Sequence, residues 1–507
     1  MYKPMSFSHL CFSIFIILMS IGFLAHNSYA ANTNGNLFQA DENSKYESSM
    51  GTNQVYMSPT GKDNGDCDTE KKPCRTFSYA ISNLSPGDGL ILLDGDYPNQ
   101  VHGELRIRDN NGNPLKDGNV NITSLSAQIP SGVDVSHPTI VRAKNPGKVF
   151  IEGGFTLGDN TTKVQHIVIY GLTFFTHSSL HNANHVIVKA CGFNSSISIG
   201  TQEHAQGCMH NLVEDVWVWG SNSRSNVTTY RSNHNIWRRV LIRDDGCDVV
   251  HCGEGRGNAS IATTVYNSNN VIMENVVSID RILRANAMSE NNTNYSDFAT
   301  AQHPYLRYGE PFPTPGGEEN GSNQWLGCMA INSDDYAINF EADEIQGNPA
   351  NIVTTITLRD FVALNTYGGI SMDGSRRAYS GVSRHSISGV HLRTRNKAVF
   401  YRGCFTPNKS DPGCTVHIPV DPVKSGAVTL GTYTGQQSKI LPQYQYINGK
   451  LSDKNLWPWP YESRIRHEIC QRATFSNTGD EYPKEGIRAT KSFCGFNGSL
   501  TDYIKSF

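Results

Sequence analysis

After its first 30 residues the sequence has no apolar run long enough to cross a membrane, and it contains no Cys-x-x-Cys pair. It also lacks a phosphate-binding glycine loop, a dinucleotide-binding glycine fingerprint and a serine nucleophile elbow in a strand–turn–helix setting. Charge is balanced, with 43 Lys and Arg against 46 Asp and Glu, so bulk charge gives no reason to expect nucleic acid or an anionic membrane as a partner. These absences argue against nucleotide-dependent and zinc-dependent functions.

What the chain does contain is a repeat of short apolar runs rich in Val and Ile, each broken near its middle. The runs begin at His166, His185, Asn211, Asn235, Asn270, Ile356 and His385, and the first five start roughly 19 to 35 residues apart. This spacing is typical of the rungs of a solenoid, whose units share one core and leave a ridged flank suited to a long polymer. The Asn or His that opens most runs is predicted to form a structural ladder, and a Gly or Asn between runs (Gly171, Gly192, Asn275) to form a corner with positive φ.

The first 30 residues read as a signal peptide, because Lys3 precedes a short apolar stretch and Ser28 and Ala30 fit a cleavage site. Residues 31–52 are polar and predict a disordered leader. The mature protein is therefore expected to be secreted, periplasmic or extracellular, with no stable membrane insertion after cleavage. The cysteine spacing agrees, since short-range disulfides are predicted for the close pairs Cys67/Cys74, Cys247/Cys252, Cys404/Cys414 and Cys470/Cys494.

The stretch "VYMSPTGKDNGDC…KPCRTFSYAISNLSPGDGLILLDGDYPN", within residues 55–99, resembles the opening of secreted right-handed parallel β-helix proteins of the pectate-lyase-like superfamily. Many of these are polysaccharide lyases or other glycan-active enzymes. The resemblance implies an all-β, right-handed parallel β-helix solenoid over residues 53–410, with an N-terminal capping helix at 76–84. We expect a polar side-loop insertion near 285–325 and an irregular C-terminal cap over 411–507.

Three carboxylates gather at a glycine turn directly after one of the runs. Asp244, Asp245 and Asp248 are close enough in sequence to repel one another unless a cation neutralises them, and Ca²⁺ accepts six to eight oxygens without strict geometry. Their spacing resembles the Asp-Asp-x-x-Asp calcium site of polysaccharide lyase family nine, with Glu214 or Asp215 as substitutes for a fourth carboxylate. The alternative is a polar turn whose aspartates cap backbone N–H groups and pair with arginine.

β-Elimination of a uronate polymer needs a neutralised substrate carboxylate, a base and a proton donor. Where the family has a lysine base, this chain offers Arg281 and Arg284, and we place Arg243 with them near the sugar carboxylate. The predicted substrate-binding residues are Arg239, His251 and Trp219. The alternative for the arginines is pairing with Asp280 on the coil surface.

Two other functions stay open. Asp334 and Asp335, followed by the turn Tyr367-Gly-Gly-Ile-Ser, are faintly similar to the polygalacturonase glycoside hydrolases, whose inverting chemistry needs two separated carboxyl groups. A non-catalytic solenoid that binds glycan or serves a structural role at a surface is the third possibility. The sequence thus predicts an exported carbohydrate-active protein with a polysaccharide partner, most simply a uronate lyase.

Overall fold

The computed structural model describes residues 51–97, 129–159, 162–200, 208–220, 225–243, 261–266, 268–280, 296–302, 323–333, 336–342, 353–374, 382–396, 398–402, 423, 425–471 and 493–507. All of them belong to one compact unit, Tyr46–Phe507. Structural statements below concern these residues only. None of their helices is long and apolar enough to span a membrane.

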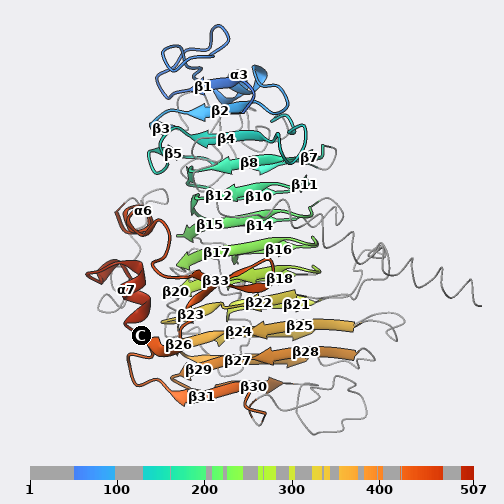
Figure 1. The fold of residues 1–507 in the computed structure, drawn as a ribbon, viewed down its shortest axis with the longest axis vertical. Coiled ribbons are helices and arrows are strands. Elements are labelled where there is room, and N and C mark those ends of the chain that lie inside the picture. Colours follow the sequence, from blue (N-terminus) through green and yellow to red (C-terminus); the bar gives the residue numbers. More distant parts are fainter. Residues whose placement is uncertain are drawn as a thin grey trace, which may run out of the picture. The chain divides into compact units, whose positions relative to one another are not determined.

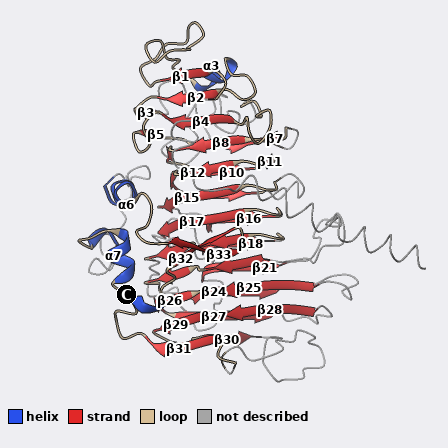
Figure 2. Ribbon diagram, viewed as in Figure 1, coloured by secondary structure: helices blue, strands red, loops and turns tan. Residues whose placement is uncertain are grey.

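Parallel strands dominate the fold and form three stacks, each strand pairing with its counterpart one rung away (Figures 1 and 2). Stack 1 contains β1 (Gln54–Met57), β2 (Gly89–Leu92), β4 (Thr139–Ala143), β8 (Ile167–Tyr170), β12 (Ile187–Lys189), the first halves of β15 (Leu212–Trp219) and β17 (Ile236–Arg243), β19 (Ile272–Glu274), β22 (Asn323–Leu326), β25 (Val353–Arg359) and β28 (Val382–Ser388).

Stack 2 contains β3 (Gly95–Tyr97), β5 (Val149–Ile151), β9 (Thr173–Phe174), β13 (Gly192–Asn194), the second halves of β15 and β17, β20 (Val277–Ile279), β23 (Met329–Ile331), β26 (Val362–Thr366), β29 (Val390–Thr394) and β31 (Val428–Thr432). Stack 3 contains β6 (Thr156–Leu157), β10 (Ser178–Leu180), β14 (Ile197–Ile199), β16 (Ser225–Tyr230), β18 (Ile261–Tyr266), β21 (Ser296–Gln302), β24 (Tyr336–Ala342), β27 (Gly368–Gly374) and β30 (Val399–Arg402). The short strands β7 (Val164–Gln165) and β11 (Ala183–Asn184) also pair in parallel.

The core lies inside the coil that these stacks enclose. Along stack 1 the paired residues Ile169, Val188, Val213, Trp237 and Met273 follow one another from rung to rung, and each is at most 2% exposed. Burying each such side chain contributes about 1.5–3 kcal/mol, which no single rung could obtain alone. The repeat of apolar runs therefore predicted the stacking correctly.

Corners between stacks 1 and 2 need residues with positive φ. Gly171 (φ 77°) and Asn275 (φ 52°) adopt it as predicted, but Gly192 does not, and the corner of its rung is Ala190 (φ 53°). Gly192 is required for a different reason, since a Cβ atom there would collide with the Glu468 carboxylate and the Trp217 indole. The glycine thus permits a close approach by the C-terminal part of the chain.

The predicted ladder is present at the corner before stack 1. The buried Asn211 donates from Nδ2 to Asn235 Oδ1 on the next rung (3.0 Å), and its own Oδ1 accepts from the backbone N–H of Val186 (3.0 Å). His166 and His185 are neighbours in the same column, with ring centroids 5.2 Å apart and planes tilted by 45°. The asparagine amides satisfy buried backbone groups at the corner, which is the structural role that was predicted.

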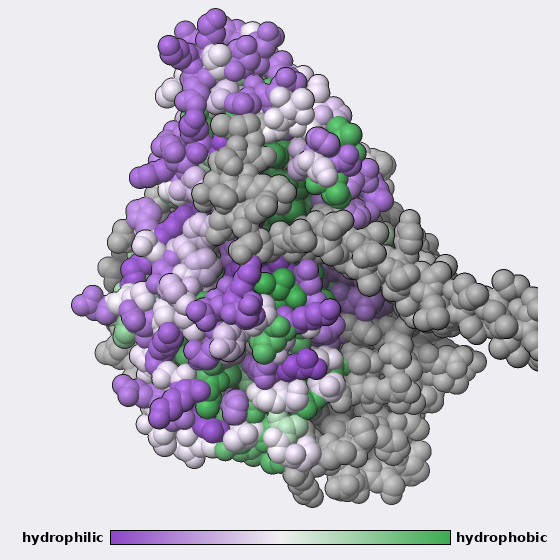
Figure 3. Space-filling view, viewed as in Figure 1, coloured by the Kyte–Doolittle hydropathy of each residue, from purple (hydrophilic) through white to green (hydrophobic). Residues whose placement is uncertain are grey.

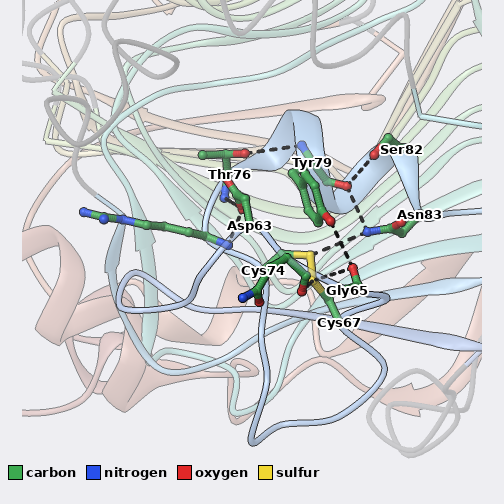
Figure 4. Close-up of a disulfide and its surroundings, with 10 residues drawn as sticks. Asp63, Gly65, Cys67, Cys74, Thr76, Tyr79, Ser82 and Asn83 are labelled. Carbon is green, nitrogen blue, oxygen red and sulfur yellow. Dashed lines mark hydrogen bonds between the residues drawn. A yellow bond between two sulfur atoms is a disulfide. The ribbon is translucent and has the colours of Figure 1, made fainter.

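The first strand is covered by a disulfide-closed loop and a short helix, α3 (Phe77–Ser82), whose N-cap is Thr76 (Figure 4). Asn83 Nδ2 donates to the carbonyl oxygen of Tyr79, and Phe77, Ala80 and Ile81 enter the core. The helix and the Cys67–Cys74 disulfide confirm two predictions. A second predicted disulfide, Cys470–Cys494, is also present, while the pairs at 247/252 and 404/414 lie outside the described residues.

The C-terminal segment (residues 437–471 and 493–507) runs along the flank of the coil, where it packs on strands of stack 2. This segment lies within residues 411–507, for which the sequence predicted an irregular C-terminal cap. It contains η4 (Ser438–Ile440), the antiparallel hairpin β32 (Tyr444–Ile447) and β33 (Lys450–Asn455), α6 (Glu462–Arg466), η5 (His467–Gln471), η7 (Phe493–Gly495) and α7 (Leu500–Lys505). Figure 1 shows α6 and α7 in red beside the strands of stack 2. The reason is the outer face of stack 2, which is apolar and must be covered.

The insertion predicted near 285–325 is interrupted by regular structure, because β21 pairs with β18 and β24, and β22 begins at Asn323. Right-handed winding and the two capping roles remain predictions.

Candidate functional site

Most of the predicted site residues lie in two segments outside the described residues. Asp244, Asp245, Asp248 and His251 fall in 244–260, and Arg281 and Arg284 fall in 281–295. The described strands show where these segments start and end in the chain. Each connects stack 2 to stack 3, the first from β17 to β18 and the second from β20 to β21. Since Arg243 pairs with Ile279 and Thr263 pairs with Phe298, the two connections belong to successive rungs.

Arg243, the last residue before the first of these segments, is buried beside Asp280, the last residue before the second. Its Nε lies 3.7 Å from Asp280 Oδ2. Asp280 also accepts hydrogen bonds from the Phe493 backbone N–H (2.7 Å), from Asn332 Nδ2 (3.0 Å) and from the Tyr503 hydroxyl. Burial raises the pKa of Asp280, against the opposing effect of Arg243 and these hydrogen bonds. Arg243 is thus held as part of a buried polar cluster with Asp280. The alternative pairing of Arg281 or Arg284 with Asp280 stays a prediction, because both arginines lie outside the described residues.

Arg239 and Trp219, both predicted to bind substrate, do not reach the surface. Arg239 Nε lies 2.6 Å from Asp215 Oδ1, its Nη2 lies 2.7 Å from Glu214 Oε1, and its Nη1 donates to Gln445 Oε1 (2.7 Å). Trp219 is fully buried in the apolar cluster shared with the C-terminal segment. In this arrangement a saccharide could touch either side chain only by displacing the C-terminal segment, whose position could not be predicted from local sequence.

Glu214 and Asp215 already form buried ion pairs, as members of an ion ladder on the outer side of stack 1. Lys189, Glu214, Arg238 and Glu274 occupy the same register on four successive rungs, with alternating charge. Lys189 Nζ lies 2.8 Å from Glu214 Oε2, and Arg238 Nε lies 2.7 Å from Glu274 Oε2. Neither Glu214 nor Asp215 is therefore available as a fourth calcium ligand.

The ladder is sealed by the hairpin of the C-terminal segment. Arg238 Nη2 donates to Asn448 Oδ1 (2.6 Å), and the Gly449 backbone N–H donates to Glu274 Oε1 (2.5 Å). Burial by itself raises the pKa of Glu214, but the charges of Arg239, Lys189 and Arg238 outweigh burial and hold that pKa well below its ordinary value. The ladder is a structural joint between the coil and its C-terminal segment, and the alternating charge at equal rung positions was the signal for it in the sequence.

Stack 3 presents a different outer face. Thr156, Ser179, Ser198, Thr228 and Thr264 pair in register on five successive rungs, and we call this set the hydroxyl column. The alternating residues Ile197, Val227 and Ile199 point into the core, so the hydroxyl column points outward. The apolar cluster that anchors the C-terminal segment draws on strands of stack 2 and, among the described residues, on none of stack 3.

Aromatic rings flank the hydroxyl column at the far end of its strands. Tyr230 and Tyr266, on adjacent rungs, stack with centroids 4.8 Å apart and planes 10° from parallel, and both are partly exposed. The Arg231 guanidinium lies 5.4 Å from the centroid of the Tyr230 ring. At the near end, the exposed His177 contacts Ser196 Oγ (2.7 Å) and Ser198 Oγ (3.3 Å).

Such a face can do two things chemically. Hydroxyl groups both donate and accept hydrogen bonds, so a column of them at the rung spacing of about 4.8 Å matches a ligand that repeats hydroxyl groups along its length. Tyrosine edges add apolar contact and a further polar tip. On the face seen in Figure 3, the coloured surface mixes hydrophilic side chains with smaller apolar patches.

No three His, Cys, Asp or Glu side chains among the described residues converge in a way that would hold a metal ion. The predicted calcium ligands, and the hydrolase candidates Asp334 and Asp335, lie outside those residues. Three cysteines, Cys191, Cys208 and Cys328, are buried thiols, and burial raises their pKa to about 11, 11 and 12. Thiols with such pKa values are inert, so we assign them to the core.

No protein-family model matches the chain, and no curated protein does. Among solved structures it is similar to a rhamnogalacturonan lyase (14% identity, 82% of this chain and 98% of that one, TM-score 0.30). It is also similar to pectate lyase Pel9A (11% identity, 76% and 89%, TM-score 0.31) and to the catalytic domain of a GH87 α-1,3-glucanase (8% identity, 76% and 70%, TM-score 0.32). Its structural neighbours thus include polysaccharide lyases at low identity.

Proposed function

We propose that this chain is an exported carbohydrate-active protein that cleaves an acidic, uronate-containing polysaccharide by β-elimination. The single observation that carries the proposal is the pairing of β17 with β20 and of β18 with β21. It means that the connection bearing Asp244, Asp245 and Asp248 and the connection bearing Arg281 and Arg284 start from adjacent strand ends and finish on adjacent strand ends. The two connections therefore join the same neighbouring pairs of strands, and we propose that their side chains lie close together beside stack 3.

The polymer would lie along the hydroxyl column, crossing successive rungs. Stack 3 supports this choice because the outer side of stack 1 carries the sealed ion ladder and the outer face of stack 2 is covered by apolar residues of the C-terminal segment. Ser and Thr hydroxyl groups, with Tyr230 and Tyr266 at the edge, would contact the sugar hydroxyl groups.

The chemistry would be divided among three groups of residues. Asp244, Asp245 and Asp248 would hold Ca²⁺, since three carboxylates suit a hard cation that accepts six to eight oxygens, and the bound ion would supply positive charge for the substrate carboxylate. Arg281 or Arg284, which can act as a base only while its guanidinium is neutral, would remove the C5 proton. The C4–O bond would then break as the C4=C5 double bond forms, and the leaving oxygen would take a proton from water. The other arginine would bind the sugar carboxylate, and His251 would contact the sugar. Arg243, whose Nε lies 3.7 Å from Asp280 Oδ2, would stand at the edge of the site near the sugar carboxylate.

One observation favours each alternative. Asp334 and Asp335 directly precede Tyr336, the first residue of β24 in stack 3, so an inverting hydrolase could also work on this face. The hydroxyl column requires no catalysis, so a glycan-binding solenoid would use it equally well.

The test is incubation of the purified protein with a panel of uronate polymers, with and without chelator, following absorbance of the unsaturated product. We expect product on at least one polymer, at least about a hundredfold loss for Asp245→Asn, and a similar loss with chelator. Asp453→Asn, at an exposed position of β33, is the matched control and should retain full rate.

New reducing ends without an unsaturated product, lost on Asp335→Asn, would favour the hydrolase. Saturable binding without any cleavage would favour the binding protein. Mass spectrometry of the exported protein should find a new N-terminus near Ala31, and retention of Met1 would contradict export by signal cleavage.

A further inference from the structure

Four histidines form a column at the corner where the chain enters stack 1. His166, His185, His210 and His234 stand on successive rungs, and their ring centroids are 5.2, 5.1 and 5.0 Å apart. All four have left-handed backbone conformations, with φ between 55° and 57°. Asn270 continues the column on the next rung with φ 54°, and its Nδ2 lies 3.1 Å from His234 Nε2. Histidine and asparagine are among the few residue types that accept this conformation.

Two imidazoles of the column, His166 and His210, have little means of stabilising a positive charge. The Nδ1 atoms of His166 and His210 are buried and have no hydrogen-bond partner. Two charged groups among the described residues act on the column. Asp134 opposes the lowering of the His166 pKa by burial, and Lys163 adds to the lowering of the His185 pKa by burial. Asp134 is itself shared with His137, whose Nδ1 is 3.0 Å away. Within the described ranges, the charged groups that act on His210 are its neighbours His234 and His185.

We infer that the histidine column is an acid-sensitive joint of the coil, which loosens the rungs from β8 to β19 when its imidazoles are forced to take up protons. Two protonated rings about 5 Å apart repel each other, and here each inner ring has such a neighbour on both sides. The inference does not depend on the activity proposed above.

The direction of the effect follows from linkage. Burial lowers the pKa of His185 to about 4, helped by His166 and Lys163, and burial lowers the pKa of His210 to about 4, helped by His234 and His185. Burial also lowers the pKa of His166, although Asp134 opposes it. The unfolded chain takes up these protons near the ordinary pKa of 6.5, so their contribution to stability is complete above that pH and is lost as the pH falls toward about 4.

The joint lies beside the hydroxyl column, because His234 follows Tyr230, the last residue of β16, by only four positions. Loosening there would disturb the connection from stack 3 to stack 1. Amide hydrogen exchange would detect it at two backbone hydrogen bonds of the column. The His185 N–H donates to the Met209 carbonyl (3.2 Å), and the His234 N–H donates to the Asn269 carbonyl (3.0 Å).

The test compares wild type with His185→Asn/His210→Asn at about pH 7.5 and about pH 5, by chemical denaturation and by amide hydrogen exchange. Asn270 shows that asparagine fits this position of the column. Acidification should raise the unfolding constant of the wild type about tenfold per histidine more than that of the variant, after allowance for solvent around the partly exposed rings. His467→Asn, at an exposed site outside the column, should behave as wild type.

An equal loss of stability on acidification in wild type and variant would overturn the inference. If the double variant does not fold at neutral pH, the test is a pH titration of the wild-type imidazole signals followed by nuclear magnetic resonance. Titration midpoints of His185 and His210 well below 6.5 support the inference, and midpoints at the ordinary value contradict it.

Discussion

At the scale of single residues, the junction between coil and C-terminal segment depends on one buried carboxylate. Glu468 accepts hydrogen bonds from Trp217 Nε1 (2.7 Å) and Arg464 Nε (2.6 Å) and is completely buried. The same arginine donates to the carbonyl oxygen of Ala190 (2.6 Å) and lies 4.6 Å from the Trp217 ring centroid. Gly192 leaves the space that this contact needs. A glycine that looked like a corner in the sequence is thus a packing position.

Glu468→Gln should destabilise the protein by about 3 kcal/mol, because it keeps the side-chain shape but leaves the Arg464 charge buried without its partner. Lys144→Gln is the control, since it breaks the exposed Lys144–Glu70 pair and should cost less than about 1 kcal/mol. Both values come from urea denaturation at neutral pH. Equal stabilities for the two variants would show that the carboxylate is not needed.

At the scale of elements, two columns of ionisable side chains join the rungs: the histidine column and the ion ladder. Their contributions to stability are lost in different pH ranges. The histidine column loses its contribution below the ordinary histidine pKa, as argued above. The ion ladder loses its contribution at lower pH, because the pKa of Glu214 is depressed by its cationic neighbours once their effect has outweighed burial. A depressed carboxyl pKa contributes stability above the unfolded value of about 4.5, and that stability disappears as the pH falls further.

Glu214→Gln should therefore lower stability at neutral pH and flatten the loss of stability below about pH 4.5. The measurement is the denaturation midpoint at several pH values, made in the His185→Asn/His210→Asn background so that histidine titration does not overlap. A variant that follows the wild-type curve below that pH would contradict the assigned role of the ladder.

At the scale of the described unit, the C-terminal segment covers the outer faces of stack 2 and of part of stack 1. Its residues Leu441, Trp459, Ile465, Phe493 and Tyr503 cover stack 2, and its hairpin seals the ladder on stack 1. The Cys470–Cys494 disulfide links η5 to η7 within this cover, across 24 residues.

Replacing both cysteines, Cys470→Ser/Cys494→Ser, should destabilise the folded protein by about 3 kcal/mol through the larger entropy of the unfolded chain. The shorter Cys67–Cys74 loop, with a separation of 7 residues, should give the smaller effect of about 2 kcal/mol in the matching serine variant. Thermal denaturation checks both. Acrylamide quenching of the buried Trp217 and Trp219 would rise only in the first variant, and a rise in the second instead would contradict this account.

The sequence alone determined the features that depend on local pattern. Apolar runs at rung spacing, an N-capped helix after Thr76, two close cysteine pairs and the Asn and His positions of the ladders could all be read directly, because each repeats or lies within a few residues. The predicted aspartates and arginines of the site could be named, and the strand pairing brings their connections to neighbouring rungs.

Only the tertiary structure decided which charged and aromatic residues are covered. Arg239 and Trp219 read as sugar-binding groups on a solenoid flank, yet they lie beneath a segment more than two hundred residues later in the chain, through contacts such as Arg239 with Gln445, 206 residues apart. Local sequence carries no record of where a distant segment will pack, because that choice depends on the whole apolar face of stack 2 at once.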